Sequence, residues 1–380
     1  MILQIIQPAI PEYRVSLFDA LGALGDMDVR VHASASSLNA AILDDETERR
    51  NFSHQLHAET GVMRNAIVWQ RAVTLSSDMD KGDVLVVCGN PRILSNVPLL
   101  LAAKRRGVGV IWWGHGGNRD SSILRFAVRR MLMKLANVIL LYTDEEVADY
   151  GRLGFDPSKL IATNNSIDQA PIERAKQEWT AERLRDFRCE NGLRGKQLLL
   201  FCGRLTEKSR FDLALEALSS LRHEGRHVVL AVIGEGDLGS RYAARSVDLA
   251  LDDHVIWIGA LYDQSKIAPW FLSADCFVYP GSIGLSLLHA FGYGLPVVTH
   301  DDLAAQMPEI AALRDGENGM LYQKQRFADL VAKISRLLDD SALRANMSRA
   351  CLETVAGEYS INNMVDRFAE AIDIASQAEK

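Results

Sequence analysis

Residues that could bind an anion form a short glycine- and serine-rich turn, residues 281–285. The turn follows an apolar run, residues 276–279, which has the composition of a buried strand. A helix is expected to begin at Leu285 and to end at Gly292. Such a turn leaves backbone N–H groups unpaired at the positive end of a helix dipole. The segment therefore predicts an anion site, and an ordinary strand–turn–helix connection is the competing interpretation.

A second group of candidate residues is basic and follows an apolar run at 197–203. Gly203 permits a tight turn, and Arg204, Lys208 and Arg210 come directly after it. Arginine offers a planar fork of donors that suits phosphate oxygens. A solvated basic loop is the alternative. We expect the turn and the basic loop to hold a diphosphate between them, through Gly203, Arg204, Lys208, Arg210, Ser282, Ile283, Gly284 and Leu285.

Two further apolar runs end in residues that could contact a nucleotide. Gly234 closes the run 228–234, where a glycine lets a ligand approach the backbone closely. Ile258 and Gly259 close the next run, 254–259, whose backbone groups could contact the edge of a base. A lone Gly-x-Gly is weak evidence, so these assignments depend on their place in the fold.

The first half of the chain contributes a histidine between glycines. His115 follows the apolar run 110–113, and we interpret it as a group that donates to a sugar hydroxyl or a phosphate. A histidine that merely caps the strand end is the alternative. Tyr13 and Arg14 follow the first apolar run and could face the same ligand, although plain packing of their loop is slightly favoured.

The elements that position these residues alternate between apolar runs and amphipathic helical stretches. This alternation predicts parallel sheets with helices on both faces. Two such series indicate two Rossmann-like domains, residues 1–168 and 169–357, that face each other across a cleft and are joined by the polar stretch 167–195. The last helix, within 358–380, is expected to pack back on the first domain. The expected strands are 2–7, 29–33, 84–88, 108–113, 138–142, 160–163, 197–203, 228–234, 254–259, 276–279 and 296–299.

Composition fits a two-domain globular protein. The chain has 380 residues, of which 48% are hydrophobic and 24% charged, and no apolar run approaches the roughly 20 residues of a membrane span. Residues 1–6 lack a basic flank and are read as a strand, not a signal peptide. Five scattered cysteines favour a reducing cytosol over a disulfide frame or a zinc site.

Charge is uneven along the chain. Between residues 92 and 134 lie nine basic residues and one acid, although the whole chain has a net charge of −7. A helix over 121–135 would pair these cations with an apolar stripe, Leu124, Val128, Met131 and Leu135. We interpret it as a surface for an anionic membrane or acceptor. Packing of the stripe on the sheet, with a solvated basic face, is an equal alternative. The cations that we expect this helix to present are Arg125, Arg129, Arg130 and Lys134.

Taken together, these segments resemble the retaining GT-B glycosyltransferases of family 4. The likeness covers nearly the whole chain, and the ordered set of motifs is more specific than any one of them. The family's motifs match, in chain order, His115, Asn165-Ser166-Ile167-Asp168, Gly203-Arg204-Leu205, Pro308-Glu309 and Asp315-Gly316-Glu317-Asn318-Gly319.

The chain departs from the family pattern at three positions. The family carries two glutamates, near the donor sugar and near the ribose, where this chain has Gly281 and His289. Its phosphate-binding lysine falls on Ser209, between Lys208 and Arg210. We expect Gly281 to leave room for a bulkier hexose, and His289 to contact the ribose differently.

The resemblance implies transfer of a hexose-type sugar, with retention, from a nucleotide-diphosphate donor to a carbohydrate or lipid-linked acceptor. It implies no metal and no cofactor, and catalytic roles for His115, Arg204 and Lys208. The expected location is the cytoplasm, at the inner face of the membrane if the basic helix docks, and no nucleic-acid partner is expected. A nucleotide-sugar epimerase and a catalytically silent nucleotide- or glycan-binding protein remain as alternatives.

Overall fold

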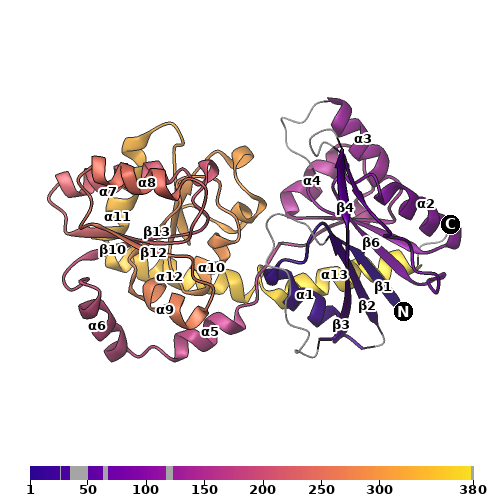
Figure 1. The fold of residues 1–380 in the computed structure, drawn as a ribbon, viewed down its shortest axis with the longest axis horizontal. Coiled ribbons are helices and arrows are strands. Elements are labelled where there is room, and N and C mark those ends of the chain that lie inside the picture. The colour runs from indigo at the N-terminus through magenta and orange to yellow at the C-terminus, as the bar shows by residue number, and fades with distance from the viewer. Residues whose placement is uncertain (26, 35–49, 63–66, 117–122, 378–380) are drawn as a thin grey trace. The chain divides into compact units, whose positions relative to one another are not determined.

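The computed structural model describes residues 1–25, 27–34, 50–62, 67–116 and 123–377. The chain forms two compact units (Figure 1): unit 1 is Met1–Asn165 with Ile361–Lys380, and unit 2 is Ser166–Ser360. Each unit has a parallel main sheet with helices packed on it, as the alternation of apolar runs predicts. Both units are therefore Rossmann-like.

Unit 1 contains a seven-stranded parallel sheet, in the order β3-β2-β1-β6-β7-β8-β9. A separate antiparallel hairpin, β4–β5, adjoins it in sequence. The strands are β1 Ile2–Ile6, β2 Asp28–Ser34, β3 Phe52–His57, β4 Glu59–Val62, β5 Ile67–Gln70, β6 Val84–Cys88, β7 Gly109–Trp113, β8 Val138–Leu141 and β9 Leu160–Ala162. The helices are α1 Glu12–Gly22, α2 Asn96–Arg106, α3 Ile123–Met133, α4 Asp144–Arg152 and α13 Ile361–Gln377.

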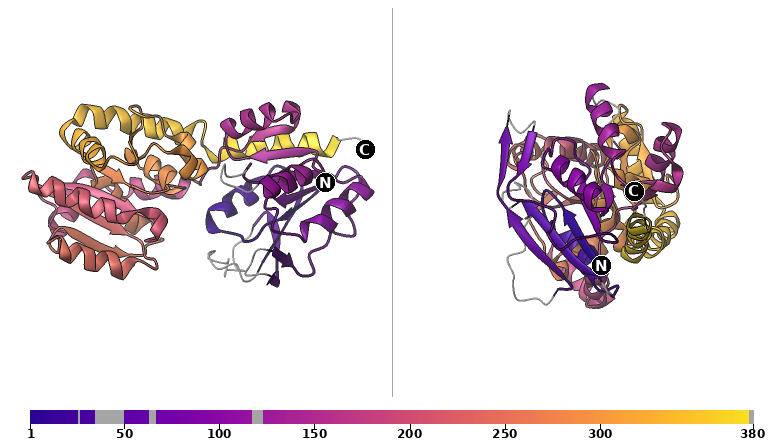
Figure 2. Two further views of the ribbon diagram at one scale, coloured as in Figure 1. Left: turned by 90° about the horizontal axis from the view of Figure 1, so that it is seen from above. Right: turned by 90° about the vertical axis from the view of Figure 1, so that its right-hand side faces the viewer.

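Alternate residues of each strand point to opposite faces of this sheet, and each face has its own apolar core. On β7, Ile111 and Trp113 belong to the core under α1 and α13, whereas Val110 and Trp112 belong to the core under α2, α3 and α4. Helix α13 buries Phe368 completely in the first core. The last helix thus packs on unit 1 after the chain has passed through unit 2, as predicted, and Figure 2 shows it in yellow among the unit 1 elements.

Unit 2 contains a six-stranded parallel sheet, in the order β12-β11-β10-β13-β14-β15. Helices α7 and α8 lie on one side of it and α9 on the other (Figure 1). The strands are β10 Gln197–Cys202, β11 Val228–Ile233, β12 Val255–Gly259, β13 Cys276–Val278, β14 Val297–His300 and β15 Gly319–Tyr322. The helices are α5 Ala170–Gln177, α6 Ala181–Glu190, α7 Phe211–His223, α8 Gly239–Asp248, α9 Gln264–Ser273, α10 Ser286–Gly292, α11 Phe327–Asp339 and α12 Ser341–Ala356.

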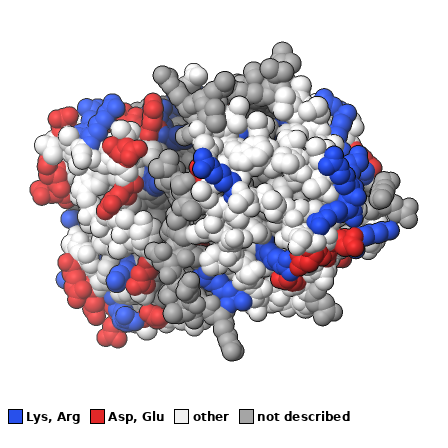
Figure 3. All heavy atoms as spheres, turned by 45° about the vertical axis from the view of Figure 1, so that its right-hand side comes forward, with Lys and Arg blue, Asp and Glu red and all other residues white. Residues whose placement is uncertain are grey.

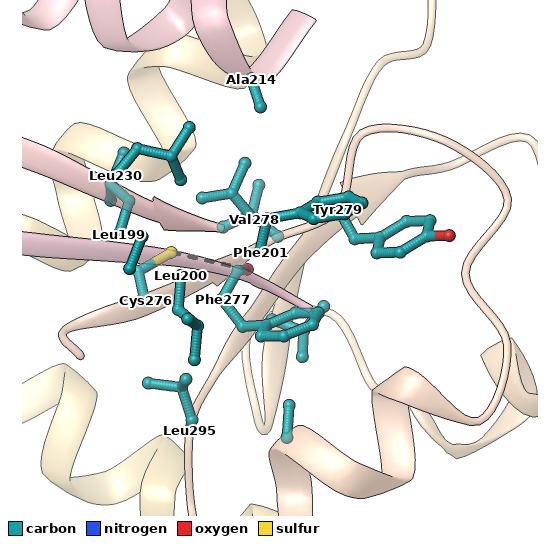
Figure 4. Close-up of a cluster of buried hydrophobic side chains, with 14 of the residues drawn as sticks. Leu199, Leu200, Phe201, Ala214, Leu230, Cys276, Phe277, Val278, Tyr279 and Leu295 are labelled. Carbon is teal, nitrogen blue, oxygen red and sulfur yellow. Dashed lines mark hydrogen bonds between the residues drawn. The ribbon is translucent and has the colours of Figure 1, made fainter. Parts of the chain in front are cut away.

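The core of unit 2 reaches the carboxyl ends of its central strands. Phe201 on β10 stacks against Tyr279, directly after β13, with ring centroids 4.9 Å apart. Figure 4 shows the Tyr279 ring at the edge of the buried cluster, with its hydroxyl directed away from it. An aromatic residue with a polar end suits this border between core and site.

Four features differ from the sequence-based expectations. Strand β3 was missed because its four central residues are exposed and three of them are polar, and β15 because it has four residues and begins with glycine. The hairpin β4–β5 was missed too. The stretch 167–195 is not a plain connection: it forms α5 and α6, and α5 buries Ile172 and Ala175 in the core of unit 2.

Candidate functional site

Glycines allow the loops at the carboxyl edge of unit 2 to touch through their backbones. A Cβ on Gly234 would lie 2.0 Å from the carbonyl oxygen of Gly203, and the φ of Gly234 is +134°. A Cβ on Gly281 would lie 1.9 Å from the carbonyl oxygen of Lys208. Real side chains do not approach backbone atoms so closely, so the loops after β10, β11 and β13 pack in a way that only glycine permits.

This packing corrects the interpretation of Gly281. The sequence suggested that the missing side chain leaves space beside a donor sugar, but the backbone of Lys208 and Ser209 fills the position where a Cβ would be. Gly281 therefore joins two loops and does not enlarge a sugar pocket.

The turn after β13 keeps two of its N–H groups unpaired. The N–H of Ser282 donates to the carbonyl oxygen of Lys208 at 2.9 Å, and the N–H of Ile283 donates to Gln306 Oε1 at 2.8 Å. Within the described part of the chain, the N–H groups of Gly284 and Leu285 have no acceptor. Of the four predicted donors in this turn, these two are available to a ligand.

The three basic residues after β10 have different surroundings. Lys208 is exposed and makes no ion pair with any described residue. Arg210 is also exposed, but its Nη2 lies 3.2 Å from Asp212 Oδ2. Ser209, where the family has lysine, is fully buried and donates to the carbonyl oxygen of Thr206 at 2.7 Å. Of Lys208 and Arg210, Lys208 is therefore the one without an ion-pair partner among the described residues.

Arg204 is exposed and lies close to the phenol of Tyr279. Burial raises the pKa of Tyr279 to about 12, and the positive charge of Arg204 partly opposes that rise. The positive charge of Arg204 therefore lies at the end of β10, where Gly203 meets the turn after β13.

The predicted nucleotide contacts lie on neighbouring strand ends of the same unit. The N–H of Gly234 donates to the carbonyl oxygen of Gly259 at 2.8 Å, and Ile258 is half-buried. The N–H of Ala260, in the backbone stretch expected to contact a base, donates to Glu235 Oε1 at 3.4 Å. The sequence did not single out Glu235, which holds the ends of β11 and β12 together.

His289, on α10, is held inside unit 2 by a partner that the sequence did not suggest. Its Nε2 lies 3.0 Å from Gln264 Oε1, which also accepts a bond from the Tyr293 hydroxyl at 2.9 Å. The imidazole packs 4.7 Å from the Phe271 ring. Burial lowers the pKa of His289 to about 4, so the ring is neutral at pH 7 and its Nε2–H donates to Gln264.

Three of the motifs that carry the family resemblance contain buried residues. Asn318 is fully buried, accepts the N–H of Arg314 at 2.7 Å and donates to the carbonyl oxygen of Ala312 at 2.9 Å. Ser166 donates to the carbonyl oxygen of Tyr359 at 2.5 Å. Glu309 is buried, and its Oε2 lies 3.7 Å from the position of a Cβ on Gly284, which brings a carboxylate near the turn.

At the carboxyl edge of unit 1, His115 pairs with Glu146, which the sequence analysis missed. Glu146 Oε1 lies 3.6 Å from His115 Nδ1 and accepts the N–H of Gly116 at 3.0 Å. Its Oε2 accepts the N–H of Tyr142 at 2.9 Å. Burial of Glu146 raises its pKa, but these bonds outweigh burial and hold the pKa below its usual range.

Local sequence explains the position of Glu146. Thr143 caps the start of α4, and its side chain accepts the N–H of Glu146 at 3.1 Å. Thr-x-x-Glu is the capping-box pattern, so the sequence contained a signal for this glutamate as a helix-start residue. The sequence contained no signal for the contact between Glu146 and His115.

Arg14 and Tyr13 lie at the same edge of unit 1. Tyr13 is 38% exposed, whereas Arg14 is 9% exposed. The guanidinium of Arg14 donates to Gln7 Oε1 at 2.7 Å and to the Tyr142 hydroxyl at 3.1 Å. It lies 4.1 Å from the centre of the Trp113 ring. Since the Tyr142 ring also contacts His115, with centroids 4.6 Å apart, the predicted residues Arg14 and His115 are neighbours through Tyr142.

The basic helix α3 differs in part from its prediction. Arg129 donates to the carbonyl oxygen of His115 at 3.4 Å, and Arg130 to that of Leu153 at 3.0 Å, so both hold loops. Lys134 is exposed. Met131, expected in the apolar stripe, is 61% exposed, and Leu132 and Met133 are buried instead. The side chains of Arg125 and Leu124 lie outside the described part of the chain.

On the face shown in Figure 3, basic side chains gather near the right edge, beside a smaller acidic group, and the centre of the face carries few charges. Among the described residues, no helix is both long and apolar enough to span a membrane.

Comparison with known proteins identifies relatives for both the sequence and the fold. Residues 196–340 match the family described as glycosyl transferases group 1. An alpha-D-kanosaminyltransferase of Streptomyces kanamyceticus is 24% identical over 255 residues, which are 65% of this chain and 62% of that protein. For three such curated relatives, the match spans between 38% and 62% of their own length.

Solved structures resemble the chain over nearly its whole length. A glycosyltransferase from Rickettsia africae superimposes with a TM-score of 0.74 at 13% identity, covering 99% of each chain. Anabaena HepE, solved in complex with UDP, gives 0.72 at 14% identity, covering 98% of this chain and 99% of that one. Residues 196–340 are thus similar to the group 1 glycosyltransferases, and the two Rossmann-like units of the chain have the fold of GT-B glycosyltransferases.

Proposed function

We propose that the chain transfers a hexose-type sugar from a nucleotide-diphosphate donor to a carbohydrate or lipid-linked acceptor, in the synthesis of a cell-surface polysaccharide or glycoconjugate. The donor binds unit 2 and the acceptor binds unit 1. No cofactor or metal takes part in this proposal.

The observation that carries the proposal is the combination of donors around the β13 turn. Lys208 is exposed and makes no ion pair with any described residue, and its carbonyl oxygen holds the turn in which Gly284 and Leu285 keep available N–H groups. These groups lie at the carboxyl edge of a doubly wound sheet, where ligands of such sheets bind. Cationic and N–H donors together suit a diphosphate.

The same groups supply the chemistry. As the sugar leaves the donor, negative charge grows on the diphosphate, and Arg204, Lys208 and the two N–H groups stabilise it. The diphosphate then takes the proton from the acceptor hydroxyl, and the sugar is transferred with retention. His115, positioned by Glu146, acts in unit 1 on the transferred sugar or the acceptor.

The nucleoside lies along the ends of β11 and β12, near Gly234, Ile258 and Gly259. His289 occupies the position of the family's ribose-binding glutamate. Because its Nε2–H donates to Gln264, only Nδ1 remains, and it accepts a single bond from the nucleoside. Anabaena HepE has been solved with UDP and with UDP-glucose, which supports testing uridine donors first.

One observation favours a second candidate, a protein that binds a nucleotide or glycan without transferring a sugar. The backbone of Lys208 closes the position of the family's first glutamate, so no side chain at residue 281 could supply that carboxylate. Incubation with a panel of nucleotide sugars, followed by assay of released nucleoside diphosphate, separates the candidates. Transfer predicts release that an acceptor accelerates and that chelator leaves unchanged, whereas binding without release supports the second candidate.

The basic residues of α3 and Lys134, which follows it, lead to a proposal about where in the cell the protein acts. We propose a cytoplasmic protein that contacts the inner face of the membrane through Arg125, Arg129, Arg130 and Lys134. Each basic residue near an anionic membrane contributes about 1 kcal/mol, so binding should be salt-sensitive. Sedimentation with anionic and neutral liposomes, at low and high salt, tests this. Equal and negligible binding to both would leave a soluble glycan as the acceptor.

A further inference from the structure

Arg14 is a buried cation, and no described residue gives it an acidic partner. The residue is 9% exposed, and no carboxylate of the described residues lies within ion-pair distance of it. The titratable groups that act on its guanidinium are two phenols and a thiol, those of Tyr142, Tyr13 and Cys88. A buried charge is costly unless an opposite charge accompanies it, so this arrangement requires an explanation.

The described partners of Arg14 orient the guanidinium and bring no negative charge to it. Gln7 and Tyr142 each accept one bond, and the Trp113 ring lies 4.1 Å from the guanidinium carbon. All three partners are neutral. A guanidinium has five N–H donors, and Nε has no acceptor among the described residues. Within the described part of the chain, the group therefore keeps its net charge and has spare donors.

The surroundings of Arg14 come from the edge of the sheet where a ligand would bind. Gln7 follows β1, Trp113 ends β7 and Tyr142 follows β8, so all three lie at carboxyl ends of parallel strands. Ligands of doubly wound sheets bind beyond these ends. The Tyr142 ring contacts His115, and Arg129 adds a second cation through its bond to the His115 carbonyl oxygen.

We propose that Arg14 is the charged ligand of an oxyanion site in unit 1, and that the acceptor is a sugar bearing a phosphate or a carboxylate. Describing this ligand as the acceptor rests on the proposed transfer reaction, but the anion site itself does not depend on that reaction. A planar guanidinium matches the two oxygens of either anion. The neutral partners hold the fork in place, and an acidic partner would have neutralised the charge that the ligand needs.

Calorimetry on the full chain, at constant ionic strength, tests the proposal. UDP is first added to saturation, so that unit 2 does not take up the probe, and glucose 6-phosphate, glucuronate and glucose are then titrated separately. We expect one or both anionic sugars to bind and glucose not to bind. Which of the two binds identifies phosphate or carboxylate as the anion. In Arg14→Met, the affinity for the anionic sugar should fall at least tenfold, while UDP binding is unchanged.

Two further variants separate ligand binding from a structural role. Arg14→Lys keeps the charge without the fork and should retain part of the affinity. Tyr142→Phe removes one bond to the guanidinium but not the charge, and should weaken the anionic sugar by less than Arg14→Met does. If Arg14→Met does not fold, the affinities of Arg14→Lys and Tyr142→Phe for the anionic sugar are compared with that of the parent instead.

Anion affinity that is absent from the parent, or equal in the parent and in the Arg14 variants, would overturn the proposal. A parent that fails to bind UDP contradicts the transfer reaction instead. The sugar titrations are then repeated without UDP, and the difference between parent and Arg14→Met still tests the anion site.

Discussion

The carboxyl edges of the two sheets offer charge to a ligand in opposite ways. In unit 2, loops pack backbone against backbone through glycines, and the cations Arg204 and Lys208 lie exposed above them. In unit 1, the charged groups of Arg14 and Glu146 are largely enclosed and bonded within the protein. Unit 2 resembles a site for a charged ligand that arrives from water, and unit 1 a site whose geometry is fixed beforehand.

This difference predicts which substitutions each of the two sites tolerates. A site built from close backbone contacts fails when a Cβ is added, and exposed cations above it can be removed at little cost in stability. A site built from enclosed groups is sensitive to the loss of a hydrogen bond, because the partner left behind is then buried and unsatisfied. The two units therefore respond to different kinds of mutation.

The largest expected effect is that of Gly281→Ala. The added Cβ would lie 1.9 Å from the carbonyl oxygen of Lys208, and backbone atoms cannot move away as a flexible side chain can. We expect a loss of about 3–5 kcal/mol in the free energy of unfolding, measured with denaturant. Gly239→Ala is the matched control in the same unit, because its Cβ would meet only a methyl group of Leu205, at 3.7 Å. Equal stability of the two variants would show that the loops are not locked together.

The same contrast explains how far the sequence predicted the site. In unit 2, the informative residues are glycines and cations adjacent in sequence, such as Gly203 and Arg204, so the pattern is local and readable. The fold was predictable for a similar reason, since buried parallel strands are continuous apolar runs. The exceptions were β3, which is exposed at the edge, and the short β15.

In unit 1, the informative contacts join residues far apart in sequence. Arg14 meets Tyr142, and His115 meets Glu146, only because parallel strands bring their carboxyl ends together. The sequence identified Arg14 and His115 one at a time and missed both of their partners. In unit 2 the same limitation concealed Gln264, the partner of His289. Single-residue patterns indicate which groups reach an edge, but not which of them meet there.

The second prediction concerns turnover. His115→Ala should lower the rate of sugar transfer by roughly 10²-fold, within the range for loss of a general acid–base group. Affinity for UDP should stay within about twofold, because His115 belongs to unit 1. Stopped assays for transfer and calorimetry for UDP measure the two quantities. A variant that folds normally and transfers at the parent rate would make His115 a structural residue.

The third prediction ranks the exposed cations of unit 2. Arg204→Ala and Lys208→Ala should each weaken UDP binding by about 1.5–3 kcal/mol, the contribution of a charge-assisted bond. Arg210→Ala should change it by less than about 0.5 kcal/mol, because Arg210 is paired with Asp212. All three variants should keep the parent's stability. If Arg210→Ala weakened UDP most, the arginine would have to exchange Asp212 for the ligand on binding.

The smallest expected effect tests the enclosed charge of Glu146. Its pKa is lowered in the folded chain, so its ionised form stabilises the fold above the unfolded pKa, about 4.3. That stability is lost as pH falls through the folded pKa, where the carboxyl becomes protonated in both states. Glu146→Gln should therefore be about 1 kcal/mol less stable than the parent at pH 7, since the amide oxygen accepts the backbone N–H bonds more weakly.

The deficit of Glu146→Gln should shrink as pH falls below about 4 and vanish once the parent's carboxyl is protonated. Denaturant melts of both proteins at pH 7, 5 and 3.5 measure it. Asp156→Asn is the matched control, because Asp156 also accepts a backbone N–H, that of Ser158, but is exposed at the surface. A deficit that stayed constant across the three pH values would mean that the charge of Glu146 contributes nothing, and that only the shape of its side chain holds His115 and the ends of β7 and β8 together.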